Sequence, residues 1–466
     1  MKQLFALLLV IVLIVSCAAV CTAVLTGDVN SDGAVNMKDV LTLRLYLSGK
    51  TAAFSPTAAD GNGDGLVNMK DVLWLRRRLV NDRSATTTTK ATKKTTTTAV
   101  TTATSADPLP AESEELCGVW IAYYEVESLL KPTVAATKAA LDSALDTCKA
   151  AGINTVFFHA RANSDAYYDS AIFPVVPKVK TLLAVGFDPF DYALNAAHSR
   201  GIAFHAWLNP YRVGNAENAV CTDTFTFGGK VYYSPASETV KKTLLSGIEE
   251  ILKKYAVDGI HFDDYFYPSG VPKTAQKFDL GYTAASGSLA DFRRAHVTDF
   301  VKRTCALTHS LNPRAQFGIS PAGNVETDVS ALYADVKTWL STPDCVDYLC
   351  PQLYYGFENS AAPFADTVAE WNALARTESV KLYVGLAMYK AGLREDVWAG
   401  EGKTEWVHGG NILARQVQTL RQIPDISGFV LFSYRYMTEA GFDDTCDKTV
   451  VKKELAALKK VLATST

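Results

Sequence analysis

The sequence has no excess of charge of either sign, few histidines, and no hydrophobic run long enough to cross a membrane. In 466 residues, 46 Lys and Arg stand against 49 Asp and Glu, a net charge of −3. Nucleic-acid binding needs clustered Lys and Arg on one face, so no nucleic-acid partner is expected. The composition, 48% hydrophobic and 20% charged, is that of an ordinary globular protein with room for several domains.

An apolar run at residues 4–15 predicts a signal peptide over residues 1–23. The run follows one positive charge, precedes small residues, and has about half of the ~20 residues that a membrane-spanning helix needs. We therefore expect a secreted, extracellular protein. The tetrapeptide that ends at Cys17 resembles a bacterial lipobox, which would leave a membrane-anchored lipoprotein. Ordinary cleavage near Ala19 or Ala23 is favoured, and both routes stay open.

Cysteine pairs with CxxC spacing are absent. Two of the nine Cys lie in the leader, and the other seven are Cys117, Cys148, Cys221, Cys305, Cys345, Cys350 and Cys446. The number is odd, and several fall in apolar strand-like or helical patterns. These features favour buried free thiols over a disulfide framework or a zinc site.

A segment rich in Asn, Asp and Gly is duplicated after the leader. The copy that begins at Asp28 recurs in register at Asp60, and each copy leads into an apolar stretch. Oxygen-bearing side chains occupy loop positions 1, 3, 5, 9 and 12, with Gly at position 6, a spacing that selects Ca²⁺. The sequence therefore predicts two calcium ions. Their side-chain ligands would be Asp28, Asn30, Asp32, Asn36 and Asp39, then Asp60, Asn62, Asp64, Asn68 and Asp71.

The duplicated segment departs from an EF-hand, because Asp closes each loop and no helix fits between the leader and Asp28. With this departure, residues 25–82 resemble a type I dockerin, a small all-α module with duplicated calcium loops. The resemblance implies a cohesin domain of a scaffoldin as partner, in a cellulosome-like complex associated with the cell surface. By similarity, the cohesin-contacting positions would be Met37, Lys38, Arg44 and Leu45, then Met69, Lys70, Arg76 and Arg77.

Residues 83–115 form a Thr-rich segment with no apolar period to bury. Such a segment cannot repay its ordering entropy, so a linker is expected. Residues 116–463 then alternate short apolar runs with amphipathic stretches, which predicts α/β structure with a parallel sheet. Eight such units predict a (β/α)₈ TIM barrel with its chemistry at the carboxyl ends of the strands. The expected strands are 119–124, 155–160, 203–208, 257–262, 316–319, 348–353, 382–387 and 428–432.

Polar residues at the expected strand ends follow a period of two. They are His159 and Arg161, then His205, Trp207 and Asn209, then His261 and Asp263, then Gln352 and Tyr354. Since side chains alternate across a strand, each set shares a face, which would be the barrel mouth. Asp264 is out of phase with Asp263, so the two carboxyl groups are expected to point to opposite faces.

Five stretches of the barrel segment, residues 152–168, 200–212, 257–268, 318–324 and 347–354, are similar to the glycosyl-hydrolase-like family 10. The resemblance spans nearly the whole domain. It implies a TIM-barrel glycoside hydrolase that cleaves O-glycosidic bonds of a polysaccharide. The dockerin favours a plant cell-wall polysaccharide, whereas the barrel's relatives leave room for a peptidoglycan-type glycan.

Glycoside hydrolysis normally takes two carboxyl groups. We predict Asp263 as nucleophile or base, with Asp264 held by Arg161 or lining the site. Glu326 and Glu358 are the candidate proton donors, with Glu125 and Asp165 behind them. The predicted substrate-binding residues are His159, Arg161, Asp165, His205, Trp207, Asn209, Arg212, His261, Asn324, Gln352, Tyr354 and Tyr434.

Two other interpretations stay open. A metal-dependent barrel, such as a deacetylase or amidohydrolase, would use the three histidines His159, His205 and His261 with Asp263. The paired His expected on its first strand is absent, since residues 119–124 contain none. A non-catalytic carbohydrate-binding barrel would use the same mouth without turnover. For a glycoside hydrolase, no cofactor is expected in catalysis.

Overall fold

The computed structural model describes residues 25–35, 37–47, 54–63, 65–67, 71, 74, 75, 78, 115–274 and 278–464. The chain divides into two compact units, residues 1–104 and 105–466. The predictions for residues 1–24, including Cys17, and for almost all of the linker lie outside the described residues. No described helix is long and apolar enough to cross a membrane.

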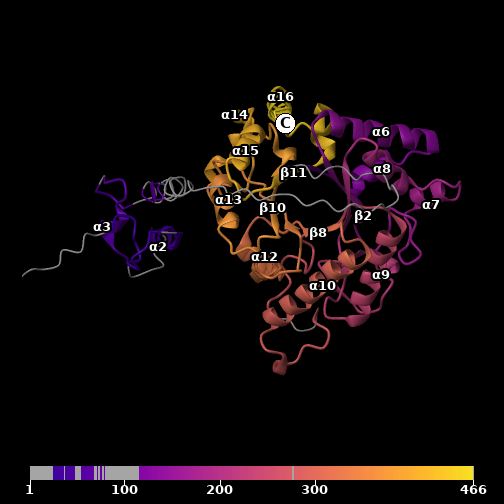
Figure 1. The fold of residues 1–466 in the computed structure, drawn as a ribbon, viewed down its shortest axis with the longest axis horizontal. Coiled ribbons are helices and arrows are strands. Elements are labelled where there is room, and N and C mark those ends of the chain that lie inside the picture. The colour runs from indigo at the N-terminus through magenta and orange to yellow at the C-terminus, as the bar shows by residue number, and fades with distance from the viewer. Residues whose placement is uncertain are drawn as a thin grey trace, which may run out of the picture. The chain divides into compact units, whose positions relative to one another are not determined.

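Eight parallel strands in the larger unit close into a barrel, as predicted from the sequence (Figure 1). Their order around the barrel is β1-β11-β10-β9-β8-β7-β3-β2, so each strand pairs with its neighbours in the chain. The strands are β1 (Leu116–Ile121), β2 (Thr155–Arg161), β3 (Ala203–Leu208), β7 (Gly259–Phe262), β8 (Gln316–Ile319), β9 (Tyr348–Leu349), β10 (Lys381–Ala387) and β11 (Gly428–Phe432).

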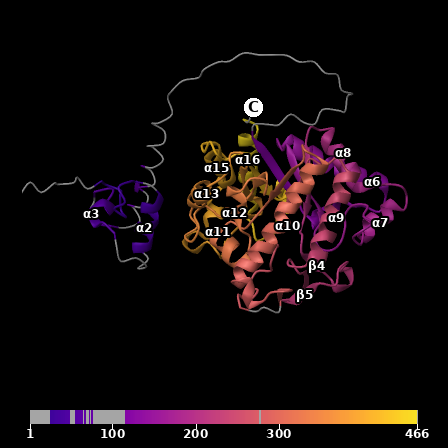
Figure 2. The same ribbon diagram turned by 60° about the horizontal axis from the view of Figure 1, so that its bottom comes forward.

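Helices surround the barrel, and α9 and α10 lie side by side on its outside (Figures 1 and 2). The helices are α5 (Tyr123–Leu129), α6 (Val134–Ala150), α7 (Pro177–Leu183), α8 (Pro189–His198), α9 (Glu238–Lys254), α10 (Leu289–Leu311), α11 (Val325–Thr327), α12 (Val336–Ser341), α13 (Phe364–Asn372), α14 (Glu405–Gly409), α15 (Ile412–Arg421) and α16 (Lys448–Leu462). Short helical turns are η1 (Ala216–Asn218), η3 (Ala284–Ser286), η4 (Asp328–Leu332), η5 (Met388–Lys390), η6 (Gly400–Gly402), η7 (Tyr434–Met437) and η8 (Glu439–Gly441).

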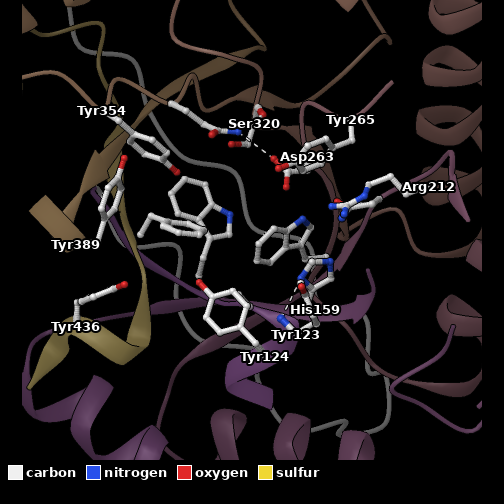
Figure 3. Close-up of a pocket in the computed structure, with 16 residues that line it drawn as sticks. Tyr123, Tyr124, His159, Arg212, Asp263, Tyr265, Ser320, Tyr354, Tyr389 and Tyr436 are labelled. Carbon is white, nitrogen blue, oxygen red and sulfur yellow. Dashed lines mark hydrogen bonds between the residues drawn. The ribbon is translucent and has the colours of Figure 1, made fainter. Parts of the chain in front are cut away.

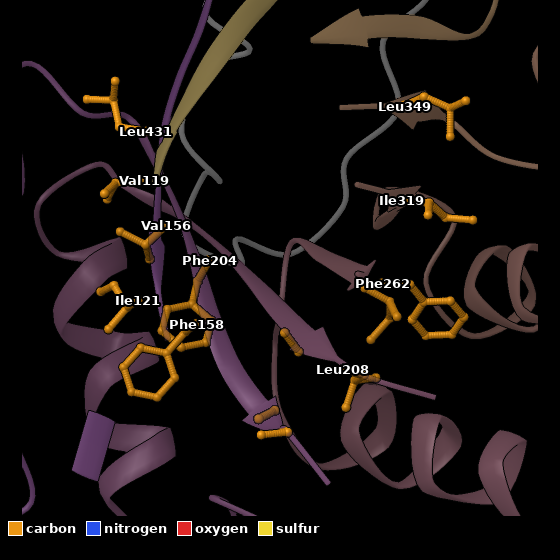
Figure 4. Close-up of a cluster of buried hydrophobic side chains, with 14 of the residues drawn as sticks. Val119, Ile121, Val156, Phe158, Phe204, Leu208, Phe262, Ile319, Leu349 and Leu431 are labelled. Carbon is orange, nitrogen blue, oxygen red and sulfur yellow. The ribbon is translucent and has the colours of Figure 1, made fainter. Parts of the chain in front are cut away.

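The continuous apolar character of the strands reflects burial on both faces. Outward-facing side chains such as Val156, Phe204 and Leu431 join one large core between the strands and the helices (Figure 4). Inward-facing side chains, among them Trp120, Phe157 and Trp207, form a second cluster inside the barrel. Two cores built from alternate residues of the same strands therefore hold the carboxyl ends of the strands in place.

Several element boundaries differ from the sequence-based expectation. β1 begins at Leu116 and ends at Ile121, so Tyr123 and Tyr124 start helix α5 instead of ending a strand. A π-helical turn, η4, and Tyr333 at φ 57° interrupt the helical stretch before α12 begins. The sequence also gave no sign of a three-stranded antiparallel sheet of β4 (Arg212–Gly214), β5 (Thr224–Phe227) and β6 (Lys230–Tyr233).

The smaller unit is all α in its described elements, α2 (Met37–Leu47) and α3 (Pro56–Ala59), with Asp71, Trp74, Leu75 and Arg78 also helical. A small core of four buried residues, Val29, Leu43, Ala59 and Leu75, joins its two halves. Backbone hydrogen bonds from Gly27 to Ala58 and from Ser55 to Val29 tie the halves together. Of the predicted cohesin-contacting side chains, Lys38 is exposed, and the others lie outside the described residues.

The seven cysteines of the barrel unit are free, as predicted. Six are buried, and Cys221 is half-buried. Burial raises the pKa of Cys117, Cys148 and Cys305 to about 12, so these thiols stay protonated and unreactive at neutral pH.

Candidate active site

A cavity of about 340 Å³ opens at the carboxyl ends of the barrel strands (Figure 3). Tyr354, Tyr389 and Tyr436 lie on one side of it, and Asp263, Tyr265 and Arg212 lie opposite (Figure 3). The residues that line it are Trp120, Ala122, Tyr123, Tyr124, His159, Trp207, Asn209, Arg212, Asp263, Tyr265, Ser320, Gln352, Tyr354, Tyr389, Phe432 and Tyr436. Aromatic side chains dominate this wall, and Asp263 is its carboxyl group.

Asp263 follows the last residue of β7 and is buried. Its Oδ1 accepts hydrogen bonds from Gln352 Nε2 at 2.9 Å and from the backbone N–H of Asp264 at 2.9 Å. Burial, and next the charge of Asp264, hold the pKa of Asp263 well above its usual value, and Arg212 opposes this shift. Burial also raises the pKa of Asp264, whereas its hydrogen bond with Asp263 lowers it. The pair therefore holds a proton more readily than a lone aspartate would.

Asp263 lines the cavity, whereas Asp264 does not, contrary to the prediction that it lines the site. The two carboxyl groups are nevertheless close enough to shift each other's pKa. Strand alternation does not apply to them, since β7 ends at Phe262. Arg161 does not hold Asp264 in the way predicted. Its guanidinium donates to the carbonyl oxygens of Asn163 and Pro210 and lies over the ring of Phe173, outside the cavity wall.

Three buried polar groups on the cavity wall, His159, Trp207 and Asn209, form what we call the cavity trio. The backbone N–H of Tyr123 donates to His159 Nδ1 at 3.2 Å, which leaves the ring proton on Nε2. Within the described barrel, His159 Nε2, Trp207 Nε1 and Asn209 Oδ1 are buried without a hydrogen-bond partner. The His159 and Trp207 rings stack, with centroids 3.8 Å apart. Burial keeps the pKa of His159 well below its usual value, so the ring is neutral.

The three side chains line the cavity, and their two unpartnered N–H donors and one unpartnered acceptor are themselves buried. Buried polar groups in native proteins are nearly always hydrogen-bonded, so three such groups on one cavity wall mark a place for a polar ligand.

Arg212 brings a positive charge to the side of the cavity where His159 and Asp263 lie (Figure 3). It begins β4, which pairs with β6, so the unpredicted antiparallel sheet positions this guanidinium. The guanidinium lies over the Tyr265 ring at 4.5 Å. The Asp263 charge and burial both raise the pKa of Tyr265, which keeps its hydroxyl protonated.

His205 and His261, predicted at the mouth, instead lie inside the barrel with Tyr348, and we call these three the interior triad. Tyr348 Oη lies 3.1 Å from His205 Nδ1 and 3.0 Å from His261 Nδ1. Trp120 Nε1 donates to His261 Nε2 at 3.1 Å. Because an indole can only donate, His261 Nδ1 carries a proton to Tyr348, whose hydroxyl then donates to His205. Burial lowers the pKa of His205 to about 4, so the triad is neutral.

Several other predicted residues also lie outside the cavity wall. Glu326 and Glu358 are exposed. Asn324 caps α11, where its Oδ1 accepts from the N–H of Thr327, and Asp165 accepts from the N–H of Asn163. Tyr434 packs against the outer core. Glu125 is buried, but its carboxylate accepts from Ala122 N and Ser433 Oγ.

The sequence pattern also failed to predict part of the cavity wall. Tyr123 and Tyr124 after β1, Tyr389 after β10 and Tyr436 after β11 line the cavity. An aromatic residue directly after a predicted strand was the signal that could have found them. Asp328 was also missed. It is buried in η4, its Oδ1 accepts from Ala322 N at 3.0 Å, and burial raises its pKa well above the usual value.

The ligand set of the metal-dependent interpretation does not converge. His159 faces the cavity, whereas both Nδ1 atoms of His205 and His261 contact Tyr348. Among the described residues, the one group of three that could hold a metal is Cys305, His309 and Asp347, away from the mouth. His309 and Asp347 bond at 2.9 Å, and His198 and Asp258 make the same pair at 2.8 Å without a cysteine. We therefore interpret these pairs as structural.

The two loops of the smaller unit share one hydrogen-bond pattern. Asp28 accepts from the N–H groups of Asp32 and Gly33, and Asp60 accepts from those of Gly63 and Gly65. The N–H of Asn30 donates to Asp39 and that of Asn62 donates to Asp71, both fully buried. Buried carboxylates need a compensating positive charge, and this oxygen-only donor set fits Ca²⁺. Asn36, Asp64 and Asn68 lie outside the described residues.

Comparisons with known proteins agree with this architecture. The model of the glycosyl hydrolase-like 10 family matches residues 115–399, and that of the dockerin type I domain matches residues 26–80. Glycosyl hydrolase DigH of Escherichia coli K12 is 29% identical over 378 residues, which cover 70% of this chain and 84% of DigH. Glycosyl hydrolase YngK of Bacillus subtilis is 30% identical over 327 residues, which cover 62% of each protein.

Among solved structures, the glycoside hydrolase domain of PgaB from Bordetella bronchiseptica is 13% identical. The match covers 70% of this chain and 94% of that domain, with a TM-score of 0.47, which indicates only a loose resemblance. The family models are the stronger finding, because one of them covers more than half of the chain. The chain therefore belongs to the glycosyl hydrolase-like 10 family and carries a type I dockerin domain ahead of its barrel.

Proposed function

We propose that this protein is a secreted, scaffold-docked glycoside hydrolase that cleaves O-glycosidic bonds of a polysaccharide at the cavity around Asp263. One observation carries the proposal: a buried carboxyl group that retains its proton lies in an aromatic-lined cavity at the carboxyl ends of the barrel strands. Catalytic groups of TIM-barrel enzymes lie at these strand ends. Aromatic faces are suited to packing against sugar rings.

Asp263 is the proton donor in this proposal. A general acid must hold a proton near neutral pH, and burial together with the charge of Asp264 keeps the pKa of Asp263 raised. Asp263 passes its proton to the glycosidic oxygen as the C–O bond breaks, and a water molecule adds to the sugar carbon. Asp264 lies outside the cavity wall and acts through its charge, which raises the pKa of Asp263. Asp263, now ionised, takes a proton from the attacking water. This role replaces the nucleophile or base role that the sequence suggested.

The cavity trio favours a glycan with amide-bearing sugars. An amide carbonyl accepts two hydrogen bonds and its N–H donates one. These needs match the unpartnered His159 Nε2 and Trp207 Nε1 donors and the Asn209 Oδ1 acceptor. Plant cell-wall polysaccharides of neutral sugars offer only hydroxyls in this position. We therefore propose a glycan with N-acetylated sugars, of the peptidoglycan type, as substrate.

Product release from defined glycans tests the function. The full chain and its Asp263→Asn variant are incubated with peptidoglycan strands with and without stem peptides, chitin oligosaccharides, xylan and cellulose. We expect release from the N-acetylated glycans, and a loss of at least about 100-fold in the variant. Glu326→Gln, in an exposed carboxyl, is the matched control. Binding without release by the wild type would favour a non-catalytic carbohydrate-binding barrel, and equal release by Asp263→Asn would contradict the assignment.

We also propose that the dockerin binds two Ca²⁺ ions and docks to a cohesin domain. The support is the shared pattern of the two loops and their buried Asp39 and Asp71 carboxylates. When bound, each ion would neutralise these carboxylates. Calorimetric titration of the full chain should give two Ca²⁺ per chain, and Asp39→Asn should remove one of them. EGTA should abolish cohesin binding, and binding that persists in EGTA would contradict the proposal.

Secretion has its own test. The signal peptide predicts that the mature protein begins after Ala19 or Ala23, or that it carries a lipid on Cys17. Mass spectrometry of the N-terminal peptide from the culture supernatant and from membranes separates these outcomes. Full-length protein with Met1 retained in the cytoplasm would contradict secretion.

A further inference from the structure

Trp398 is unlike every other tryptophan of the barrel. The other five, Trp120, Trp207, Trp339, Trp371 and Trp406, are at most 4% exposed, whereas Trp398 is 85% exposed. Its neighbour Val397 is 69% exposed. Two adjacent large apolar side chains in water contribute nothing to the core, so their exposure indicates a binding role.

The segment that carries Trp398 is held in place from beneath. Asp396 is only 3% exposed, and its Oδ2 accepts from Lys390 Nζ at 2.6 Å. Its Oδ1 accepts from the backbone N–H of Trp398 at 3.4 Å, and its own N–H donates to the Lys403 carbonyl at 2.7 Å. The Ala399 carbonyl accepts from Ser360 N at 3.0 Å. A buried ion pair and these hydrogen bonds therefore fix the backbone under an exposed indole.

The segment is also braced on the cavity wall. It follows β10 and η5, and Tyr389 of η5 lines the cavity. Lys390 Nζ, besides its bond to Asp396, donates to the carbonyl oxygen of Tyr354 at 2.8 Å. The rings of Tyr354 and Tyr389 meet edge to face, with centroids 5.8 Å apart. A short chain of direct contacts thus connects the backbone of Trp398 with two aromatic residues of the cavity.

Size and charge indicate the ligand. A cavity of about 340 Å³ is near the lower limit for small-ligand sites, so it encloses only a short part of a polysaccharide. The rest of the chain must pass over the surface at the strand ends. Most charges around Trp398 are paired, since Lys403 pairs with Glu395 at 2.8 Å and Arg394 lies 3.5 Å from Asp447, and Glu401 adds one exposed negative charge. This balance fits a neutral glycan better than a polyanion.

We propose that Trp398, with Val397, is a separate sugar-binding platform that stacks on a ring of the same polysaccharide several units from the cleaved bond. The ligand class of the platform rests on the proposed function. A platform at this position makes cleavage depend on the length of the polysaccharide. Indole faces pack on the C–H faces of sugar rings without requiring charge. Phe or Tyr at position 398 would keep part of the stacking surface.

Chain-length dependence tests the platform. kcat/KM is measured for the full chain and for its Trp398→Ala variant. The substrates are the polymer that the wild type cleaves and oligosaccharides of increasing length prepared from it. We expect a 5- to 20-fold loss on the polymer, no change on the shortest substrate, and partial recovery in Trp398→Tyr. Val185→Ala, another exposed apolar residue at 68%, is the matched control. An equal loss on short and long substrates, or no loss on either, would overturn the platform.

A binding assay separates failure of the platform from failure of the proposed function. The inactive Asp263→Asn chain is compared with Asp263→Asn/Trp398→Ala for retention on insoluble chitin, peptidoglycan sacculi and xylan. Weaker retention of the double variant supports the platform even if the wild type cleaves nothing. Equal retention of the two chains, or no retention of either, overturns the platform. If no glycan is retained but a purified protein binds the wild type and not Trp398→Ala, the surface belongs to a protein partner.

Discussion

The interior triad and the cavity trio both combine buried histidine with another aromatic side chain, but they have different roles. In the triad, Tyr348 joins both imidazoles and Trp120 fills the remaining nitrogen of His261, so the chain of hydrogen bonds is continuous. In the trio, His159, Trp207 and Asn209 are equally buried, yet each keeps an unpartnered polar atom. Burial is thus alike in the two groups, which differ in hydrogen-bond satisfaction and in whether they line the cavity.

Tyr348→Phe should have the largest effect, and the effect should be on stability. It removes the hydroxyl that both His205 and His261 contact and leaves two buried ring nitrogens unpaired. Each such loss costs roughly 1–3 kcal/mol, so we expect the free energy of unfolding to fall by about 2–4 kcal/mol in urea titrations. Tyr211→Phe is the matched control, because its buried hydroxyl has no partner in the described structure. If Tyr348→Phe and Tyr211→Phe lowered the free energy of unfolding equally, the hydrogen bonds of the interior triad would not be what stabilises it.

His159→Phe should show the reverse profile. It keeps the stacking on Trp207 but removes the Nε2 donor, so kcat/KM should fall by about 10- to 100-fold, as expected for a lost hydrogen bond to substrate. The free energy of unfolding should fall by only about 1 kcal/mol, because Nε2 has no partner to lose in the described protein and the one bond lost is that from the part-buried Tyr123 N–H to Nδ1. Steady-state kinetics and urea titration measure the two effects. A large stability loss with unchanged kinetics would place His159 with the triad.

Asp263→Asn should stabilise the fold at neutral pH. The folded pKa of Asp263 is raised above its unfolded value of about 3.9, so its contribution to stability is present below pH ~4 and is lost as pH rises through the folded pKa. Asn does not titrate and avoids this loss. We expect the free energy of unfolding of Asp263→Asn to exceed that of the wild type by about 1 kcal/mol at pH 7, and this difference to shrink toward pH 4. A stability difference that does not vary with pH would show that Asp263 keeps an ordinary pKa.

Glu326→Gln and Glu358→Gln should have the smallest effects. Both carboxylates are exposed and lie outside the cavity wall, so neither kcat/KM nor stability should change by more than about twofold or 0.5 kcal/mol, respectively. Parallel assays with the Asp263→Asn variant give the reference. A loss near that of Asp263→Asn in either variant would return it to the position of proton donor.

Much of the fold and part of the site could be predicted from the sequence. Apolar runs alternating with helices fixed the eight-stranded barrel, and the period of two brought His159, Trp207, Asn209, Asp263, Gln352 and Tyr354 to one cavity. The same period wrongly included His205 and His261, because an inward-facing residue can lie in the packed interior of the barrel as well as at its mouth. Asp263 lines the cavity and Asp264 does not, although both follow the strand that ends at Phe262.

By itself, the sequence determined the duplicated calcium-loop module, the barrel and the position of Asp263, since spacing and hydrophobic period are local properties of the chain. Only the tertiary structure decided which polar groups find partners. Tyr348 reaches His205 across 143 residues and Trp120 reaches His261 across 141, whereas nothing reaches the unpartnered atoms of the cavity trio within the described protein. Hydrogen bonding depends on distance and direction between segments far apart in the chain, and these are fixed only when the barrel closes.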